Sequence, residues 1–178
     1  PKAVERIESY DPAWPLPKLF RLKKGDKINQ GIFEGATINT PSLLATEDYI
    51  AALEWAKSIG GRTALFERAD ANSKLVKDWI ESKSWLRNMV SDPAKQTNTG
   101  VCMVFQGEWY ENLSAEDQAA VPKKIVKMLE ERNVGYDFNG YRDAPPSLRI
   151  WCGGTVEASD IEALLPWIEW AYETVKNG

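Results

Sequence analysis

Two arginines in the segment GYRDAPPSLRIWCGG, residues 140–154, have the type and spacing needed to bind an anion. Arg142 lies in a predicted turn, and Arg149 lies seven residues later in a predicted buried strand. An unpaired charge in apolar surroundings is costly, and a guanidinium matches carboxylates and phosphates through two parallel hydrogen bonds. We therefore expect both arginines to bind an anionic substrate. The alternative is structural: Arg142 is solvated, and Arg149 pairs with a carboxylate such as Asp137 or Asp143.

A second candidate site is the sequence Asn39-Thr40-Pro41, which precedes a predicted helix. The first N–H groups of a helix have no partners within the helix and carry the positive end of its dipole, so they suit a phosphate. The side chains of Asn39 and Thr40 add donors at the same place. The plain alternative is that Thr40 is an ordinary N-cap, with Pro41 at the first helical position.

The composition restricts the class of protein. A chain of 178 residues, 43% of them hydrophobic, fits one ordinary domain or a small domain with part of a neighbour. A net charge of −4 argues against nucleic acid or an anionic membrane as partner, and no apolar run is long enough to span a membrane. The absence of histidine excludes a Ser-His-Asp triad, a histidine-bound zinc and an imidazole base. Demanding chemistry therefore has to come from a cofactor or from another segment.

The two cysteines, Cys102 in VCMVF and Cys152 in IWCGG, lie in predicted core strands. Neither has the spacing of a metal site, and reduced core thiols are typical of cytoplasmic proteins. We expect a cytoplasmic protein without a metal site.

The first part of the chain alternates short elements with breaks. Residues 3–10 read as a helix, the proline-interrupted residues 11–20 as an extended segment, and residues 20–33 as a hairpin that turns at Gly25-Asp26. A helix is predicted from Pro41 until Gly60-Gly61 stops it, and a second helix over residues 63–82.

The second part has the pattern of a small α/β sandwich. We predict strands over residues 99–106, 135–138 and 147–153, and helices over residues 114–134 and 159–175. Ser159 and Glu162 have the spacing of a capping box for the last helix. The order strand, helix, strand, strand, helix predicts a sheet with one face covered by two helices.

Two long segments, INTPSLLATEDYIAALEWAKSIGG and YRDAPPSLRIWCGGTVEASDIEALLPWIEWAYE, resemble the C-terminal half of the phosphoserine aminotransferases. These are class V, fold-type I enzymes that depend on pyridoxal phosphate. The resemblance runs over the whole chain and includes PAWPLPK and LRIWCG. It implies an α/β fold made of the end of the large domain, residues 1–61, and a small substrate-binding domain, residues 62–178, whose antiparallel or mixed sheet is covered by helices.

The resemblance also implies roles for individual residues. Asn39 and Thr40 match the pair that reaches across a homodimer to the cofactor phosphate of the neighbouring subunit. Arg149 matches the arginine that holds the substrate α-carboxylate. Arg142 and Tyr141 match the segment that holds the substrate phosphate, with two departures: Tyr141 replaces a histidine, and the interval to Arg149 is one residue longer.

The implied activity is transamination between phosphoserine and 2-oxoglutarate, or 3-phosphohydroxypyruvate and glutamate, in serine biosynthesis. The lysine that binds the cofactor covalently has no matching motif here, so no catalytic residue is expected in this chain. We interpret Lys18, Lys23, Lys24 and Lys27 as surface residues. The chain is then a C-terminal fragment, inactive alone, whose partners are a second copy, the missing N-terminal half and small-molecule substrates.

Two other functions fit the same residues. Another class V aminotransferase, such as one acting on alanine or on serine and glyoxylate, would share Arg149 and have no need of Arg142. A stand-alone, non-catalytic α/β domain that binds a small anion would need neither the cofactor nor the missing half.

Overall fold

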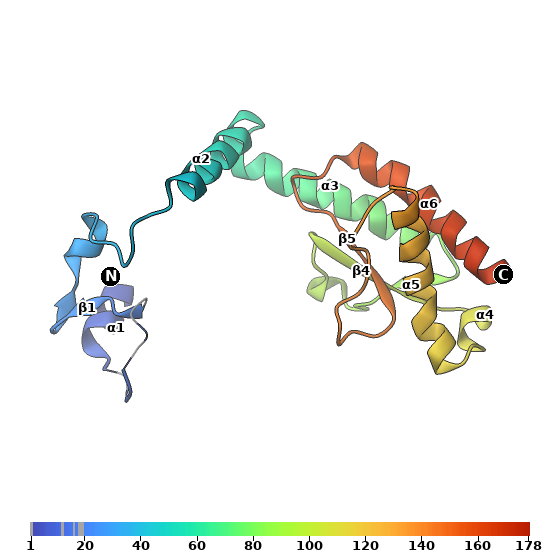
Figure 1. Ribbon diagram of the computed structural model, residues 1–178, viewed down its shortest axis with the longest axis horizontal. Helices are drawn as coiled ribbons and strands as arrows, with labels where there is room; N and C mark the ends of the chain where they lie inside the picture. The colour runs from blue at the N-terminus through green and yellow to red at the C-terminus, as the bar shows by residue number, and fades with distance from the viewer. Residues whose placement is uncertain (1, 12, 16, 18–19) are drawn as a thin grey trace. The chain divides into compact units, whose positions relative to one another are not determined.

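The computed structural model describes residues 2–11, 13–15, 17 and 20–178. The chain divides into two compact units, residues 1–54 and residues 55–178, and the division falls inside helix α2 (Leu43–Ser58). Figure 1 shows the elements of each unit. Among the described residues, no helix combines the length and the apolar character that crossing a membrane requires.

The first unit contains a short helix and a hairpin. Helix α1 (Lys2–Ser9) confirms the first predicted helix. Strands β1 (Lys23–Lys24) and β2 (Lys27–Ile28) pair antiparallel, as predicted, and Gly25 adopts the φ of +64° that the turn requires. A 3₁₀ helix, η2 (Gln30–Phe33), follows. The predicted extended segment includes Pro12, Leu16, Lys18 and Leu19, which lie outside the described residues.

Helix α2 begins later than predicted. Its first residue is Leu43, and the hydroxyl of Ser42 accepts a hydrogen bond from the Ala45 amide at 3.2 Å. Ser42 is therefore the N-cap, and the assignment of that position to Thr40 was wrong. Two hydroxyl residues two positions apart can each cap a helix, and the local pattern does not choose between them.

The second unit is built on helices and one three-stranded sheet. Gly60 and Gly61, with φ of +113° and +72°, end α2 as predicted and start helix α3 (Gly61–Glu81). Helices α4 (Glu108–Glu111), α5 (Ala115–Glu131) and α6 (Ala158–Asn177) follow, with a 3₁₀ helix η3 (Pro93–Lys95). The strands are β3 (Leu86–Asn88), β4 (Gly100–Phe105) and β5 (Ser147–Trp151), antiparallel in the order β3-β4-β5.

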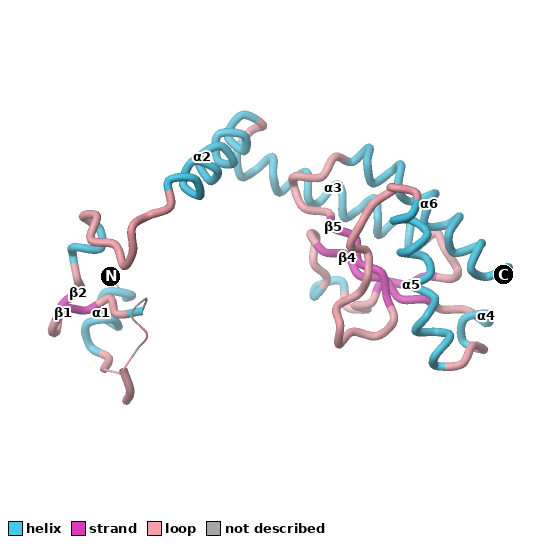
Figure 2. Tube along the Cα trace, viewed as in Figure 1, coloured by secondary structure: helices cyan, strands magenta, loops and turns pink. Residues whose placement is uncertain are grey.

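One face of this sheet forms the core with the helices (Figure 2). Met103 of β4, Ile150 of β5 and Leu86 of β3 are at most 2% exposed and belong to one hydrophobic cluster. The cluster includes side chains of α3, α5 and α6, among them Val76, Ile125, Leu129, Ile161 and Ile168. The prediction of two covering helices was therefore wrong, because α3 also packs on this face.

Residues 135–138 do not form a strand, contrary to the prediction. Asp137 has a φ of +60°, in the left-handed region, which interrupts an extended backbone. The neighbouring residues still reach β5: the Arg149 amide donates to the Phe138 carbonyl at 2.8 Å, and the Gly140 amide donates to the Ser147 carbonyl at 3.1 Å. Strand β3, in contrast, was not predicted, since three residues carry too little pattern.

The cap of α6 also differs from the prediction. The helix begins at Ala158 with Glu157 at the N-cap, so Ser159 lies inside the helix and the capping box is absent. Tertiary contacts fix this start, because Arg68 of α3 binds the Glu157 carboxylate at 2.5 Å. Arg68 also donates to the carbonyl of Gly154 at 2.7 Å, which ties α3 to the turn between β5 and α6.

The contact between Gly140 and β5 generates a stability prediction. A Cβ on Gly140 would lie directly against the Ser147 hydroxyl, which is buried and has no hydrogen-bond partner among the described residues. We expect Gly140→Ala to lower the free energy of unfolding by about 1–3 kcal/mol, as overpacking does. Gly100→Ala is the matched control, since its Cβ would meet nothing within 4 Å.

Removing the Ser147 hydroxyl leaves room for a Cβ on residue 140. We expect Ser147→Ala to be neutral or stabilising and to reduce the cost of Gly140→Ala in the double variant. Urea unfolding of the four chains measures this coupling. Additive effects of the two substitutions would contradict the contact.

Candidate substrate-binding site

Arg149 lies on the face of the sheet opposite the core. Side chains alternate along β5, so Leu148 and Ile150 point to the helices and are 1% and 2% exposed, while Arg149 points away. Its pairing partner on β4 is Cys102. The Arg149 side chain is 39% exposed, so the expected apolar surroundings cover it only partly.

Arg149 lines a hollow of about 640 Å³, which we call the Arg149 hollow. Its polar lining includes residues from two loops. Thr97 and Thr99 come from the loop before β4, and Tyr136 and Asp137 come from the loop after α5. The apolar wall includes Trp151, Ile161 and Leu164.

The Arg149 guanidinium forms an ion pair within the hollow. Its Nη2 lies 2.8 Å from Oδ2 of Asp137, whose side chain is 83% exposed. The sequence predicted this ion pair as the structural alternative to substrate binding by Arg149. Asp137 has a left-handed backbone conformation, and so does Asn133, which precedes it in the same loop. The side-chain oxygen of Asn133 accepts a hydrogen bond from the Tyr136 hydroxyl at 2.7 Å.

Two threonines line the same hollow. The Thr97 hydroxyl lies 3.1 Å from that of Thr99 and accepts the Thr99 amide at 3.2 Å. Sequence reasoning missed both, because QTNTG before a strand reads as an ordinary polar loop. A guanidinium and hydroxyl groups of one lining are a donor set that can bind a carboxylate or phosphate.

Arg142 and Tyr141 lie outside the lining of the Arg149 hollow. The Arg142 side chain is 84% exposed, and its ion pair with the adjacent Asp143 has an N–O distance of 3.7 Å. Tyr141 is 67% exposed. The structure therefore does not bring Arg142 into the lining of the Arg149 hollow.

Asn39 and Thr40 belong to the first unit. They lie in the loop between η2 and α2, where the Thr37 hydroxyl donates to the Asn39 carbonyl at 2.8 Å. Both are exposed, and neither side chain makes a hydrogen bond to a described residue. Their amide and hydroxyl groups can therefore bind a phosphate.

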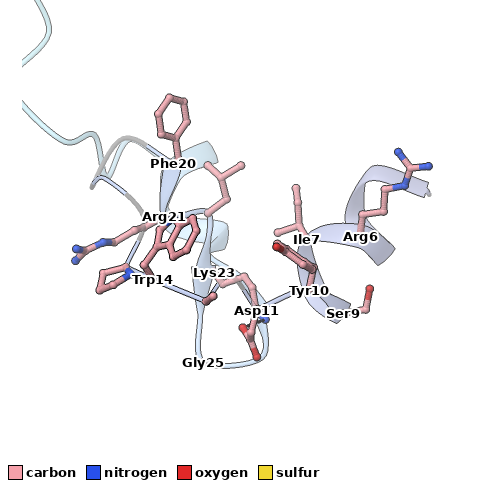
Figure 3. Close-up of a pocket in the computed structure, with 13 residues that line it drawn as sticks. Arg6, Ile7, Ser9, Tyr10, Asp11, Trp14, Phe20, Arg21, Lys23 and Gly25 are labelled. Atoms are coloured by element: carbon pink, nitrogen blue, oxygen red, sulfur yellow. Dashed lines mark hydrogen bonds and ion pairs between the residues drawn. The ribbon is translucent and has the colours of Figure 1, made fainter.

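The first unit has a hollow of its own, of about 890 Å³ (Figure 3). Ile7 and Tyr10 line it from α1 and the end of that helix, and Trp14 and Phe20 line it from the segment that follows. None of the predicted site residues is part of this lining.

The lysines interpreted as surface residues differ in their surroundings. Lys24 and Lys27 are exposed, as expected. Lys23 is partly buried: its side chain is 18% exposed, and its Nζ lies 3.0 Å from Asp11 Oδ1. Lys18 lies outside the described residues.

The cysteines have different surroundings. Cys152 is fully buried, and desolvation raises the pKa of its thiol to about 11. Cys102 is half-buried on the sheet face that carries Arg149. Among residues 2–11, 13–15, 17 and 20–178, no group of three acidic, cysteine or histidine side chains could hold a metal ion.

Comparison with known proteins gives a consistent result. No protein-family model matches the chain. The phosphoserine aminotransferase of Methanosarcina mazei is 48% identical over 176 residues, a match that covers 99% of this chain and 45% of that protein. The chain thus spans less than half the length of this curated relative.

Solved structures show the same likeness. A phosphoserine aminotransferase from Bacillus circulans subsp. alkalophilus has a TM-score of 0.65 at 19% identity, over 80% of this chain and 36% of that one. A phosphoserine aminotransferase from Trichomonas vaginalis with bound pyridoxal phosphate has a TM-score of 0.63 at 18% identity, over 78% and 36%. The predicted fold class and the resemblance to this family are confirmed.

The difference between the two cysteines predicts their reactivity. At pH 8 a thiol with a pKa of about 11 is ionised in roughly one molecule in a thousand, and burial further protects Cys152. We expect iodoacetamide to alkylate Cys102 first and Cys152 only after denaturant is added. Peptide mass spectrometry over time measures both rates, and equal rates in the folded chain would contradict this arrangement of the sheet.

Proposed function

We propose that this chain is the substrate-binding part of a phosphoserine aminotransferase, an enzyme dependent on pyridoxal phosphate. The activity is amino-group transfer between phosphoserine and 2-oxoglutarate, or between glutamate and 3-phosphohydroxypyruvate in the direction of serine biosynthesis. The observation that carries this proposal is the 48% identity to such an enzyme over 99% of the chain. The exposed guanidinium of Arg149 in its hollow supports it independently.

The proposal assigns the two parts of the chain different tasks. Residues 1–61 form the end of the large cofactor-binding domain, and residues 62–178 form the small domain that binds substrate. The remaining part of the enzyme, which the 45% coverage of the relative leaves unmatched, supplies the N-terminal half. The complete enzyme is a cytoplasmic homodimer.

The cofactor phosphate is bound by Asn39 and Thr40 in this proposal, from the neighbouring subunit of the dimer. The donor set fits, because both side chains are exposed and free of hydrogen bonds to described residues. When bound, pyridoxal phosphate supplies the carbonyl group that takes up and releases the amino group. The lysine that holds it covalently lies outside this chain, and no residue of the chain is catalytic.

Arg149 binds and orients the substrate. Its planar fork can hold the α-carboxylate through two hydrogen bonds, which fixes the position of the amino group on the adjacent carbon. The Thr97 and Thr99 hydroxyls line the same hollow and can donate to the carboxylate. Binding of the α-carboxylate, which does not react, thus positions the amino group, which does.

Arg142 and Tyr141 bind the distal anion: the phosphate of phosphoserine, or the side-chain carboxylate of glutamate. Their exposure leaves them open to a substrate group that extends beyond the Arg149 hollow. Arg142 and Tyr141 do not line the Arg149 hollow. This observation equally favours a second candidate, a class V aminotransferase whose substrate has no distal anion.

Arginine variants of the complete enzyme test these assignments. We expect Arg149→Ala to lower kcat/KM for every amino-acid substrate by roughly 100-fold, because all carry the α-carboxylate and a lost charged partner costs about 3 kcal/mol in a closed site. Arg149→Lys is the control that keeps the charge, and it should rescue only in part. Arg142→Ala should penalise phosphoserine and glutamate and leave alanine at its already low rate.

The measurement is kcat/KM for these three substrates with each variant. Equal losses for alanine and phosphoserine in Arg142→Ala would show that Arg142 supports the loop structurally. Full activity of Arg149→Ala would show that the substrate α-carboxylate does not bind to Arg149 on β5.

Thr40 is tested by cofactor retention. We expect Thr40→Ala in the complete enzyme to weaken pyridoxal phosphate binding by about 10- to 100-fold, since a hydrogen bond to a charged group contributes about 1.5–3 kcal/mol. Thr63→Ala, on the exposed side of α3, is the matched control. Cofactor absorbance after dialysis measures the loss. Unchanged cofactor retention in Thr40→Ala would show that Thr40 does not bind the cofactor phosphate and has a role in the loop alone.

A further inference from the structure

The ion pair between Arg149 and Asp137 occupies the group that the proposed function gives to the substrate. Nη2 of Arg149 lies 2.8 Å from Oδ2 of Asp137. In the part of the chain that the structure describes, Arg149 has no other ion pair and no other side-chain hydrogen bond. A carboxylate of the protein itself is thus bound where a substrate carboxylate is expected.

This contact uses a small part of what the guanidinium offers. Arginine has five N–H donors in a planar fork, and Asp137 takes a hydrogen bond from Nη2 alone. A free carboxylate can approach the fork edge-on and accept two parallel hydrogen bonds. The substrate group is therefore the stronger ligand of the two, and the donors that remain are available to it in a hollow of about 640 Å³.

Asp137 is placed so that it can leave. Its side chain is 83% exposed, so water can solvate the carboxylate when the pair opens. Its backbone has a φ of +60°, in the same loop in which the Tyr136 hydroxyl donates a hydrogen bond to the Asn133 side chain. The carboxylate therefore stays close to Arg149 while remaining exchangeable.

On these observations, and on the proposed function of Arg149, we propose that Asp137 is a built-in competitor of the substrate carboxylate and sets the affinity of the site. While it is paired, only a fraction of the molecules has a free guanidinium, and the apparent dissociation constant rises in proportion. The competition favours substrates that bind the fork through two oxygen atoms. Ligands that accept a single hydrogen bond do not displace Asp137.

Asp137→Asn tests the competition without changing the backbone. Asparagine has nearly the same shape and tolerates a positive φ, so the substitution removes only the charge. Asp78→Asn is the matched control: it removes the same charge from an exposed pair with Lys74 on α3, outside the Arg149 hollow. Glutarate is the probe, because it carries two carboxylates and has no amino or keto group with which to react.

The experiment is titration calorimetry of glutarate into the complete enzyme at low and high salt. We expect Asp137→Asn to lower the dissociation constant by about 1.5- to 5-fold at low salt, the range that an exposed ion pair supports. The gain should shrink at high salt, which screens the pair. Asp78→Asn should bind as the unchanged enzyme does, and KM for glutamate should fall in Asp137→Asn alone.

An unchanged or higher dissociation constant in Asp137→Asn would overturn the inference, since Asp137 would then orient Arg149 for the substrate or have no part in binding. Arg149→Ala separates this result from a failure of the proposed function. If that variant binds glutarate as tightly as the unchanged enzyme, the carboxylate site itself is wrong.

Discussion

The two-residue period of β5, held in register by β4, is the constraint on which the candidate site depends. Leu148 and Ile150 are buried against the helices, and this burial forces Arg149, between them, to the opposite face of the sheet. A slip of one residue would bury the guanidinium in the core and expose two large apolar side chains. The hydrophobic core therefore fixes the direction of the charged side chain.

The surroundings of Arg149 are assembled from loops rather than from the sheet. The loop after α5 is attached to β5 by the hydrogen bond from the Arg149 amide to the Phe138 carbonyl, so the residue that points into the hollow also anchors part of its wall. Thr97 and Thr99 line the hollow from the loop before β4. Behind β5, Arg68 and Asn72 of α3 hold the turn into α6 by bonds to its carbonyls.

The proposed function separates binding from bond making. In that proposal the chain binds anions: the cofactor phosphate at Asn39 and Thr40, the α-carboxylate at Arg149 and the distal anion at Arg142. A chain without histidine suits this role, because arginine, threonine and asparagine bind anions without having to change protonation state. The residues that carry out proton transfer are then expected in the remainder of the enzyme.

The sequence by itself determined the long helices α2, α3, α5 and α6, apart from the first residues of α2 and α6, and the strands β4 and β5. These features follow from the spacing of apolar residues and from glycine at Gly60 and Gly61, which are local properties of the chain. The resemblance to the phosphoserine aminotransferases also followed from sequence alone, since long ordered segments identify a family when single residues do not.

Only the tertiary structure decided what the local pattern left open. Arg68 places the start of α6 at a residue different from the predicted cap, and left-handed Asp137 replaces a predicted strand by a loop. The sequence likewise offered Asp137 and Asp143 as partners of Arg149, and the fold selects Asp137. Both ion pairs join residues that are not neighbours in sequence, and the spacing of neighbours along the chain carries no information about such contacts.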